Sequence, residues 1–239
     1  MICIFNIHWW CSWNLNSSLI PYSLIISLVQ LQMVNTSTIH SLVRISRNTS
    51  LWFEKFFEWV SYILDDGEYF MPPELLSIYG TETYANLTKE QKRELSRIEA
   101  IQVIYLYAYT ESVMCYYLAR HLVKSDFWSE EHAFILREQI EEYRHQDMFL
   151  RWLEILGKDF HQVSRFTKWW TWLEAIILPA RYFFLLQIAI ELISREVWRI
   201  CFQDMTVNKL VWDLCLMHER DEARHIAFSD TYIEKESTK

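Results

Sequence analysis

Apolar residues recur every three or four positions along most of the chain, which is the period of an amphipathic helix rather than of a strand. An early example covers residues 51–64. Its apolar positions are Trp52, Phe56, Phe57, Val60 and Ile63. The pattern predicts a helix over Leu51–Leu64 that ends before Gly67, because glycine following two aspartates is typical of a turn.

Two long helices are predicted next, each with a capping signal at its start. Thr88 and Gln91 have the spacing of a capping box, which predicts a helix from there to about Leu122. Ser129 is followed by two glutamates and predicts a second start, because acidic residues favour a helix N-terminus. We expect this helix to end at Gly157, since glycine is common just past a helix C-terminus.

Two further helical stretches complete the pattern. The first covers Trp169–Phe202 and is expected to break or kink at Pro179. The second covers Thr206–Glu234, with Thr206 as its N-cap. Three glycines and four prolines in 239 residues leave few turns. The prediction is therefore an all-α protein, a four-helix bundle with additional N-terminal helices, in which residues 51–239 form one domain.

Residues 1–50 are predicted to be an uncharged N-terminal extension of unknown role, since no Lys, Arg, Asp or Glu occurs before Arg44. The apolar stretch Leu19–Val34 has sixteen residues and is short for a membrane-spanning helix, which needs about twenty. A secretory signal or a transit peptide would carry basic residues that are not present here. Met33 is an alternative start of the protein.

Net charge and cysteine usage narrow the class of protein. The formal net charge of −8 argues against nucleic acid as a partner, because binding phosphates requires clustered Lys and Arg. The five cysteines, Cys3, Cys11, Cys115, Cys201 and Cys215, form no CxxC motif. We interpret them as buried free thiols of a reducing compartment, which predicts a cytoplasmic location.

Isolated acidic residues interrupt the apolar faces of the long helices. Glu111 is the one charged residue in Ala100–Leu118. Burying a lone carboxylate costs several kcal/mol, so Glu111 must be protonated, paired with a cation or bound to a metal. The next helix carries Glu142 and His145, three residues apart and therefore on one face.

The last two helices repeat this arrangement. Glu191 follows the uncharged run Tyr182–Ile190, whereas the alternative, Glu196, has two arginines nearby that suit a solvated role. We therefore prefer Glu191. Glu222 and His225 then have the spacing of Glu142 and His145, and an acid precedes each glutamate. A single Glu-x-x-His is weak evidence, but two acid-preceded copies on separate helices exceed chance.

The order Glu, Glu-x-x-His, Glu, Glu-x-x-His on successive helices is the ligand set of di-iron and di-manganese carboxylate bundles. Four carboxylates balance the charge of two divalent ions. Oxygen and imidazole ligands suit two iron ions, with manganese possible, and leave positions open for dioxygen. His218 lies one turn before Glu222 and is predicted to be a third imidazole ligand.

Other polar and aromatic residues near these motifs receive secondary roles. Asp221 is a candidate for orienting a ligand histidine. Glu138 and Glu141 either do the same or are solvated, and the pattern leaves this open. Trp169, Trp170 and Trp172 are candidates to line a substrate mouth, but we favour packing in the core.

The segment "MHERDEARHIAF", with His218-x-x-x-Glu222-x-x-His225, resembles the last metal helix of the p-aminobenzoate N-oxygenase (AurF-type) di-iron oxygenases of the ferritin-like superfamily. "PPELLSIYGTETYANLTKEQKRELSRIEA" is similar to the segment before that family's first metal helix. The resemblance covers about Trp52 to Glu234. It implies seven metal ligands, which are Glu111, Glu142, His145, Glu191, His218, Glu222 and His225.

The resemblance also implies an activity and partners. Members of this family activate dioxygen at the reduced di-iron site, oxidise an amine nitrogen toward nitro and form homodimers. We accordingly expect an oxygenase with a small organic substrate, an amine, and an external electron donor. The alternatives are a rubrerythrin-like ferroxidase or peroxidase, a desaturase-like hydroxylase, and a helical binding module without enzymatic activity. An apolar cavity beside the metals would favour an oxygenase over a ferroxidase.

Overall fold

A computed structural model describes residues 39, 41–45, 69–157, 159–204 and 206–237. The helix predicted over Leu51–Leu64 lies outside these residues. So do Met33, Cys3, Cys11, and the boundary between the N-terminal extension and the bundle. Three of the predicted thiols are described, and Cys115, Cys201 and Cys215 are all free and buried.

Most of the described residues are helical, which confirms the all-α class. Residues 39 and 41–45 are helical. From residue 69 on, the described part contains a 3-10 helix, η2 (Pro73–Leu75), and six α-helices. The six are α5 (Glu82–Ala85), α6 (Lys89–Leu122), α7 (Glu130–Leu156), α8 (Arg165–Ile177), α9 (Ala180–Gln203) and α10 (Lys209–Ser237). The β-pairing within the described part is one isolated parallel bridge between Tyr69 and Val207. None of the described helices is long and apolar enough to cross a membrane.

The first helical hairpin, α6 and α7, begins and ends where the sequence predicts. The Gln91 amide donates to Thr88 Oγ1 at 3.2 Å, and the Thr88 amide donates to Gln91 Oε1 at 2.9 Å, which completes the capping box. Ser129 Oγ accepts from the His132 amide at the start of α7. Gly157 ends α7 with a φ of 117°, a conformation that side chains other than glycine rarely adopt.

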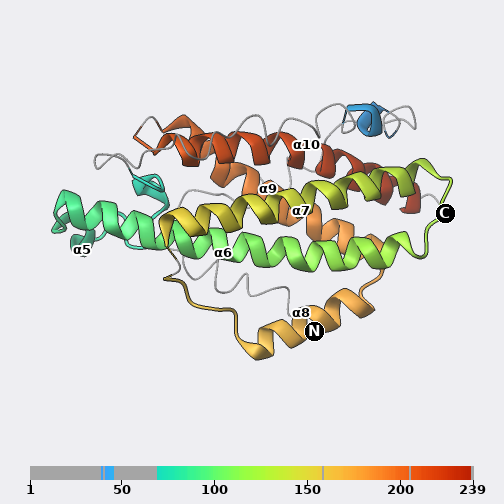
Figure 1. Cartoon of the computed structure of the whole chain (residues 1–239), viewed down its shortest axis with the longest axis horizontal. Coiled ribbons are helices and arrows are strands. Elements are labelled where there is room, and N and C mark those ends of the chain that lie inside the picture. Colours follow the sequence, from blue (N-terminus) through green and yellow to red (C-terminus); the bar gives the residue numbers. More distant parts are fainter. Residues whose placement is uncertain (1–38, 40, 46–68, 158, 205, 238–239) are drawn as a thin grey trace. The chain divides into compact units, whose positions relative to one another are not determined.

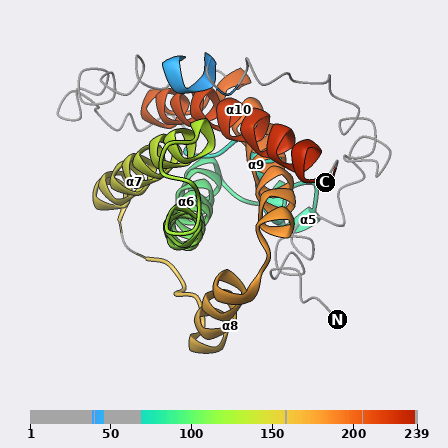
Figure 2. The ribbon, with the colours of Figure 1, turned by 90° about the vertical axis from the view of Figure 1, so that its right-hand side faces the viewer.

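The third predicted stretch is two helices, α8 and α9, separated at Pro179 as expected for a residue without a backbone N–H. The predicted start at Trp169 is four residues late, because Ser164 Oγ accepts from the Thr167 amide and caps α8. Arg120, near the end of α6, donates to the carbonyl oxygens of Ala175 and Leu178. Helix α8 thus returns the chain along α6, so that α9 runs in the same direction as α7 (Figures 1 and 2).

The prediction that Thr206 caps the last helix is wrong. Backbone hydrogen bonds join the Tyr69 amide to the Thr206 carbonyl at 3.0 Å and the Asn208 amide to the Tyr69 carbonyl at 2.8 Å. This pairing keeps residues 206–208 out of the helix. Asn208 Oδ1 instead accepts from the Leu210 amide, and α10 begins at Lys209.

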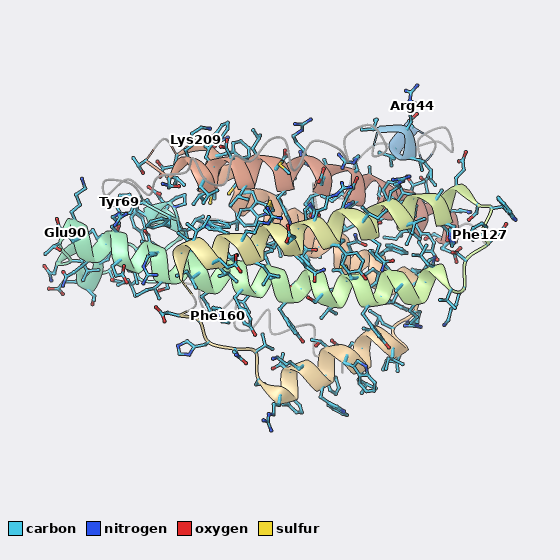
Figure 3. The ribbon with its side chains drawn as sticks, viewed as in Figure 1. Arg44, Tyr69, Glu90, Phe127, Phe160 and Lys209 are labelled. Atoms are coloured by element: carbon cyan, nitrogen blue, oxygen red, sulfur yellow. The ribbon has the colours of Figure 1, made fainter. Side chains whose placement is uncertain are left out.

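Helices α6, α7, α9 and α10 lie side by side, and their inward side chains fill the space between them (Figures 2 and 3). Two apolar clusters occupy this interior, one after the other along the helix axes. The first cluster contains Ile104, Trp152, Trp198 and Leu210, among others. The second contains Leu118, Phe134, Phe184 and Phe228. On each helix the acidic and histidine residues of interest lie between the two clusters.

The expectation that the tryptophans of α8 pack in the core is wrong for two of them. Trp169 is 51% exposed and Trp172 is 50% exposed. Helix α8 buries Thr171 and Ala175 instead, and Tyr109 of α6 hydrogen-bonds to Thr171. The residues of α8 that face α6 are therefore small, which lets α8 pack closely against α6 on the outside of the bundle.

Phe228 tests how far the second apolar cluster stabilises the bundle. Its ring is fully buried and stacks on Phe134 with 4.2 Å between ring centroids. We expect Phe228→Ala to lower the free energy of unfolding of the metal-free protein by about 3–5 kcal/mol, because it leaves a cavity. Phe166→Ala, at a side chain 71% exposed, should change it by less than about 0.5 kcal/mol. Urea denaturation followed by circular dichroism measures both, and equal losses would contradict this description of the core.

Candidate metal centre

All seven predicted metal ligands lie in one buried region. One comes from α6, two from α7, one from α9 and three from α10. They are Glu111, Glu142, His145, Glu191, His218, Glu222 and His225. None is more than 6% exposed. Side chains separated by more than a hundred residues in sequence therefore meet at one level of the bundle.

The possible ligand atoms fall into two groups, in each of which all the atoms lie within 4.8 Å of one another. The His218 cluster consists of Glu111, His145, His218 and Glu222. The Glu138 cluster consists of Glu138, Glu142, Glu191 and His225. Each group has the size and ligand types of a site for one metal ion.

In the His218 cluster, two imidazole nitrogens face two carboxylates. His218 Nε2 lies 3.2 Å from Glu111 Oε1 and 3.1 Å from Glu222 Oε1. His145 Nδ1 lies 3.6 Å from Glu222 Oε1 and 4.0 Å from Glu111 Oε1. The four side chains converge on the same small volume.

Glu142 and Glu222 extend between the two clusters. Glu142 has Oε2 3.3 Å from His145 Nδ1 and Oε1 3.2 Å from His225 Nδ1. Glu222 has Oε1 beside the His218 cluster and Oε2 3.4 Å from His225 Nδ1. A carboxylate with one oxygen toward each cluster is suited to bridge two metal ions.

Buried polar atoms without hydrogen bonds test whether metal ions fit this centre. Glu138 Oε2, Glu191 Oε2 and His225 Nδ1 are buried and have no hydrogen-bond partner. Leaving such atoms unsatisfied costs about 1–3 kcal/mol each, and more when they are charged. All three belong to the Glu138 cluster. A divalent cation there would satisfy them together, so the residues present fit a metal centre.

Two further acids hold the outer nitrogens of two of the histidines. Asp221 Oδ2 lies 3.3 Å from His145 Nε2, and Glu141 Oε2 lies 3.1 Å from His225 Nε2. Arg224 forms ion pairs with both acids. Each contact links α7 to α10, and each fixes a histidine with Nδ1 toward the carboxylates. Asp221 thus has the contact expected of it, and Glu141 is buried rather than solvated.

Burial shifts the protonation of the metal-free centre. It raises the pKa of Glu111 and of Glu191 well above the usual range. It also raises the pKa of Glu138 to about 8 and lowers that of His218 to about 4. Burial works to lower the pKa of His145 too, but hydrogen bonds with Asp221 and Glu142 outweigh it and raise this pKa to about 10. In the metal-free protein, protons on these carboxyl groups and on His145 therefore neutralise the buried charge, and metal binding must release these protons.

The two halves of the centre have the same spacing along the chain. An interval of 80 residues relates these pairs: Glu111 and Glu191, Glu138 and His218, Glu141 and Asp221, Glu142 and Glu222, Arg144 and Arg224, His145 and His225. The α6–α7 hairpin and the α9–α10 hairpin therefore present matching residues at matching heights.

The structure separates the two candidate acids of α9. Glu191 is 4% exposed, lies in the Glu138 cluster and accepts from Gln187 Nε2 at 2.6 Å. Glu196 is on the surface, where Arg199 Nε donates to its Oε2 at 2.8 Å. This geometry supports the choice of Glu191 over Glu196.

Glu138 is the one member of the two clusters that the sequence analysis did not predict to be a metal ligand. It is fully buried, which excludes the solvated role that the sequence left open. Helix α7 carries five other glutamates, so its acidic residues alone do not distinguish a ligand. The signal that was available is spacing, because Glu138 precedes Glu142 by four residues just as His218 precedes Glu222.

Comparison with known proteins identifies relatives of the chain. A family model described as p-aminobenzoate N-oxygenase AurF matches residues 32–239. Uncharacterised proteins of Mycobacterium bovis and Mycobacterium tuberculosis are 24% identical over 159 residues, which is 64% of this chain and 46% of each relative. The chain thus spans about half the length of the curated relatives it matches. No solved structure matches it.

The choice between Glu191 and Glu196 can be tested by metal binding. We expect Glu191→Ala to abolish tight binding of one ion, because it removes a carboxylate from the Glu138 cluster. Glu196→Ala removes a surface ion pair worth less than about 1 kcal/mol and should leave binding unchanged. The measurement is metal stoichiometry after anaerobic loading with Fe²⁺, and the reverse pattern would show that the wrong face of α9 has been assigned.

His218 can be tested in the same way. We expect His218→Ala to weaken metal binding at least about tenfold while circular dichroism stays that of a folded helical protein. A histidine that only fills space would behave differently, because its loss would lower the melting temperature and leave metal affinity intact. Calorimetric titration with Fe²⁺, together with thermal unfolding of the metal-free variant, distinguishes the two roles.

Proposed function

The chain belongs to the p-aminobenzoate N-oxygenase AurF family, and we propose that it is a non-haem di-iron oxygenase that uses dioxygen to oxidise a small organic substrate. The observation that carries the proposal is the pair of buried clusters joined by Glu142 and Glu222. A helical binding module has no need of unsatisfied carboxylates between two apolar clusters, so this arrangement argues against the module.

Seven residues would hold the two ions. Glu111, His145 and His218 would serve the first, Glu191 and His225 the second, and Glu142 and Glu222 both. When bound, a pair of ferrous ions with open coordination positions supplies the electrons for dioxygen reduction. Iron is proposed over manganese because of the family, and the ligand types suit both metals.

The protein's own residues prepare the centre for this chemistry. Asp221 and Glu141 accept hydrogen bonds from Nε2 of His145 and His225, which keeps each Nδ1 directed into the centre, where it would bind a metal ion once its own proton is released. Arg224 lies between the two acids and fixes their position. The apolar clusters on either side exclude bulk water, which strengthens every electrostatic interaction within the centre.

The finer activity that we propose is N-oxygenation of an amine. The support is family membership, since the curated relatives are uncharacterised. The proposal includes an external electron donor, a homodimer and a cytoplasmic location. The buried free thiols Cys115, Cys201 and Cys215 agree with a reducing compartment.

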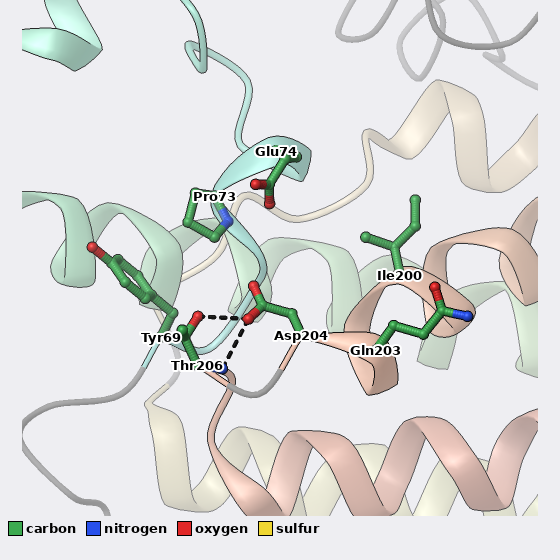
Figure 4. Close-up of a pocket in the computed structure, with 7 residues that line it drawn as sticks. All are labelled: Tyr69, Pro73, Glu74, Ile200, Gln203, Asp204 and Thr206. Carbon is green, nitrogen blue, oxygen red and sulfur yellow. Dashed lines mark hydrogen bonds between the residues drawn. The ribbon is translucent and has the colours of Figure 1, made fainter.

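A surface pocket of about 520 Å³ lies away from the centre, beside the loop that joins α9 to α10 (Figure 4). Tyr69, Glu74 and Asp204 contribute to its lining, and none of the seven predicted ligands does. Asp204 accepts hydrogen bonds from the amide and the hydroxyl of Thr206, so its carboxylate stabilises a turn. We therefore place the reaction at the buried centre and not in this pocket.

The proposed function is tested by metal content and single-turnover oxidation. We expect two iron ions per chain after anaerobic loading, and uptake of dioxygen by the reduced protein. In the presence of an arylamine, we expect label from ¹⁸O₂ in the oxidised product, measured by mass spectrometry. If the iron is oxidised but no amine of a test panel gives a labelled product, the protein is a ferroxidase. Metal content near zero in folded protein would leave only the binding module.

A further inference from the structure

One turn before the glutamate of each Glu-x-x-His motif lies a second residue that can bind metal. On α10 it is His218, four residues before Glu222, and on α7 it is Glu138, four residues before Glu142. Residues four apart lie on the same helix face, so both project toward the centre with the motif that follows. The family pattern has a ligand at the first of these positions only.

Glu138 has the surroundings of a ligand rather than of a structural acid. It is fully buried, and it shares the Glu138 cluster with Glu142, Glu191 and His225. One oxygen, Oε1, accepts a hydrogen bond from Gln187 Nε2. The other, Oε2, has no partner. A carboxylate held at one oxygen and unsatisfied at the other is suited to bind a cation with the free oxygen.

The Gln187 side-chain amide donates a hydrogen bond to Glu138 and to Glu191. Its Nε2 lies 2.6 Å from Glu191 Oε1, while its own Oε1 accepts from Ser229 Oγ at 3.3 Å. Glu191 is left with an unpartnered Oε2, as Glu138 is. The amide therefore fixes one oxygen of a predicted ligand and one oxygen of Glu138, and leaves the second oxygen of each unsatisfied within the same cluster.

We propose that Glu138 is an eighth protein ligand of the centre and serves the second metal ion as His218 serves the first. This inference rests on the two-ion centre proposed above. It makes the two sites unequal, because the His218 cluster has two imidazoles and two carboxylates while the Glu138 cluster has one imidazole and three carboxylates. The additional negative charge favours the more highly charged ion in the Glu138 cluster.

The test compares two substitutions at this position with a matched control. Glu138→Gln keeps the size of the side chain and an oxygen for Gln187, but removes the anionic ligand. Glu138→His gives α7 the same His-x-x-x-Glu-x-x-His spacing as α10. Glu99→Gln is the control. Glu99, on α6, is buried as Glu138 is, but the amide and the hydroxyl of Ser77 donate to both of its carboxylate oxygens.

Each protein is titrated anaerobically with Fe²⁺ in a calorimeter, after circular dichroism has verified its helical content. We expect two tightly bound ions in the wild type, in Glu99→Gln and in Glu138→His. In Glu138→Gln we expect one tightly bound ion, with the other at least about tenfold weaker.

The possible failures are distinguishable. A wild type that binds fewer than two ions contradicts the proposed function itself. Two ions bound with unchanged affinity by Glu138→Gln would overturn the eighth ligand alone, and so would a loss that Glu138→His does not restore. If Glu138→Gln does not fold, Glu138→Ala takes its place beside Glu138→His, and the same outcomes decide: loss of one tightly bound ion supports the ligand role, and two ions bound with unchanged affinity overturn it.

Discussion

Burial of many ionisable groups in one layer of an apolar bundle is the constraint on which the rest of the structure depends. Carboxylates from four helices lie between two hydrophobic clusters, where their charge is poorly solvated. Hydrogen bonds such as those from Gln187 satisfy only some of their oxygens, and cations or protons must stabilise the rest. The fold can keep such a layer because long helices pack on both sides of it, so that the cost is carried by the whole bundle and not by one element.

The helical period determines which of these ionisable side chains face one another. A glutamate and a histidine three residues apart share a face, and the acid before each glutamate points to one side of it. That acid contacts the histidine of the opposite helix, so that Glu141 and Asp221 connect α7 and α10 in both directions. The contacts that orient the candidate ligands are thus the same contacts that join the helices, which couples the metal centre to the packing of the bundle.

Features that depend on a few neighbouring residues could be predicted from the sequence, and features that depend on contacts with distant parts of the chain could not. The capping box at Thr88, the cap at Ser129 and the break at Pro179 are local, and each lies where the pattern places it. Thr206 failed as a cap because Tyr69, far away in the chain, pairs with its backbone. Trp169 failed as a core residue because α8 packs with its small side chains.

The 80-residue interval has a consequence for how such a centre can be assembled. Each helical hairpin contains a lone glutamate, a Glu-x-x-His motif, an orienting acid and one additional metal-binding residue, at the same positions. A hairpin of this kind would build a complete centre by associating with a copy of itself. The two halves of this chain have the arrangement that duplication and fusion of one self-associating hairpin would leave. Under that history, His218 and Glu138 mark a position where the two copies came to offer different types of metal-binding group.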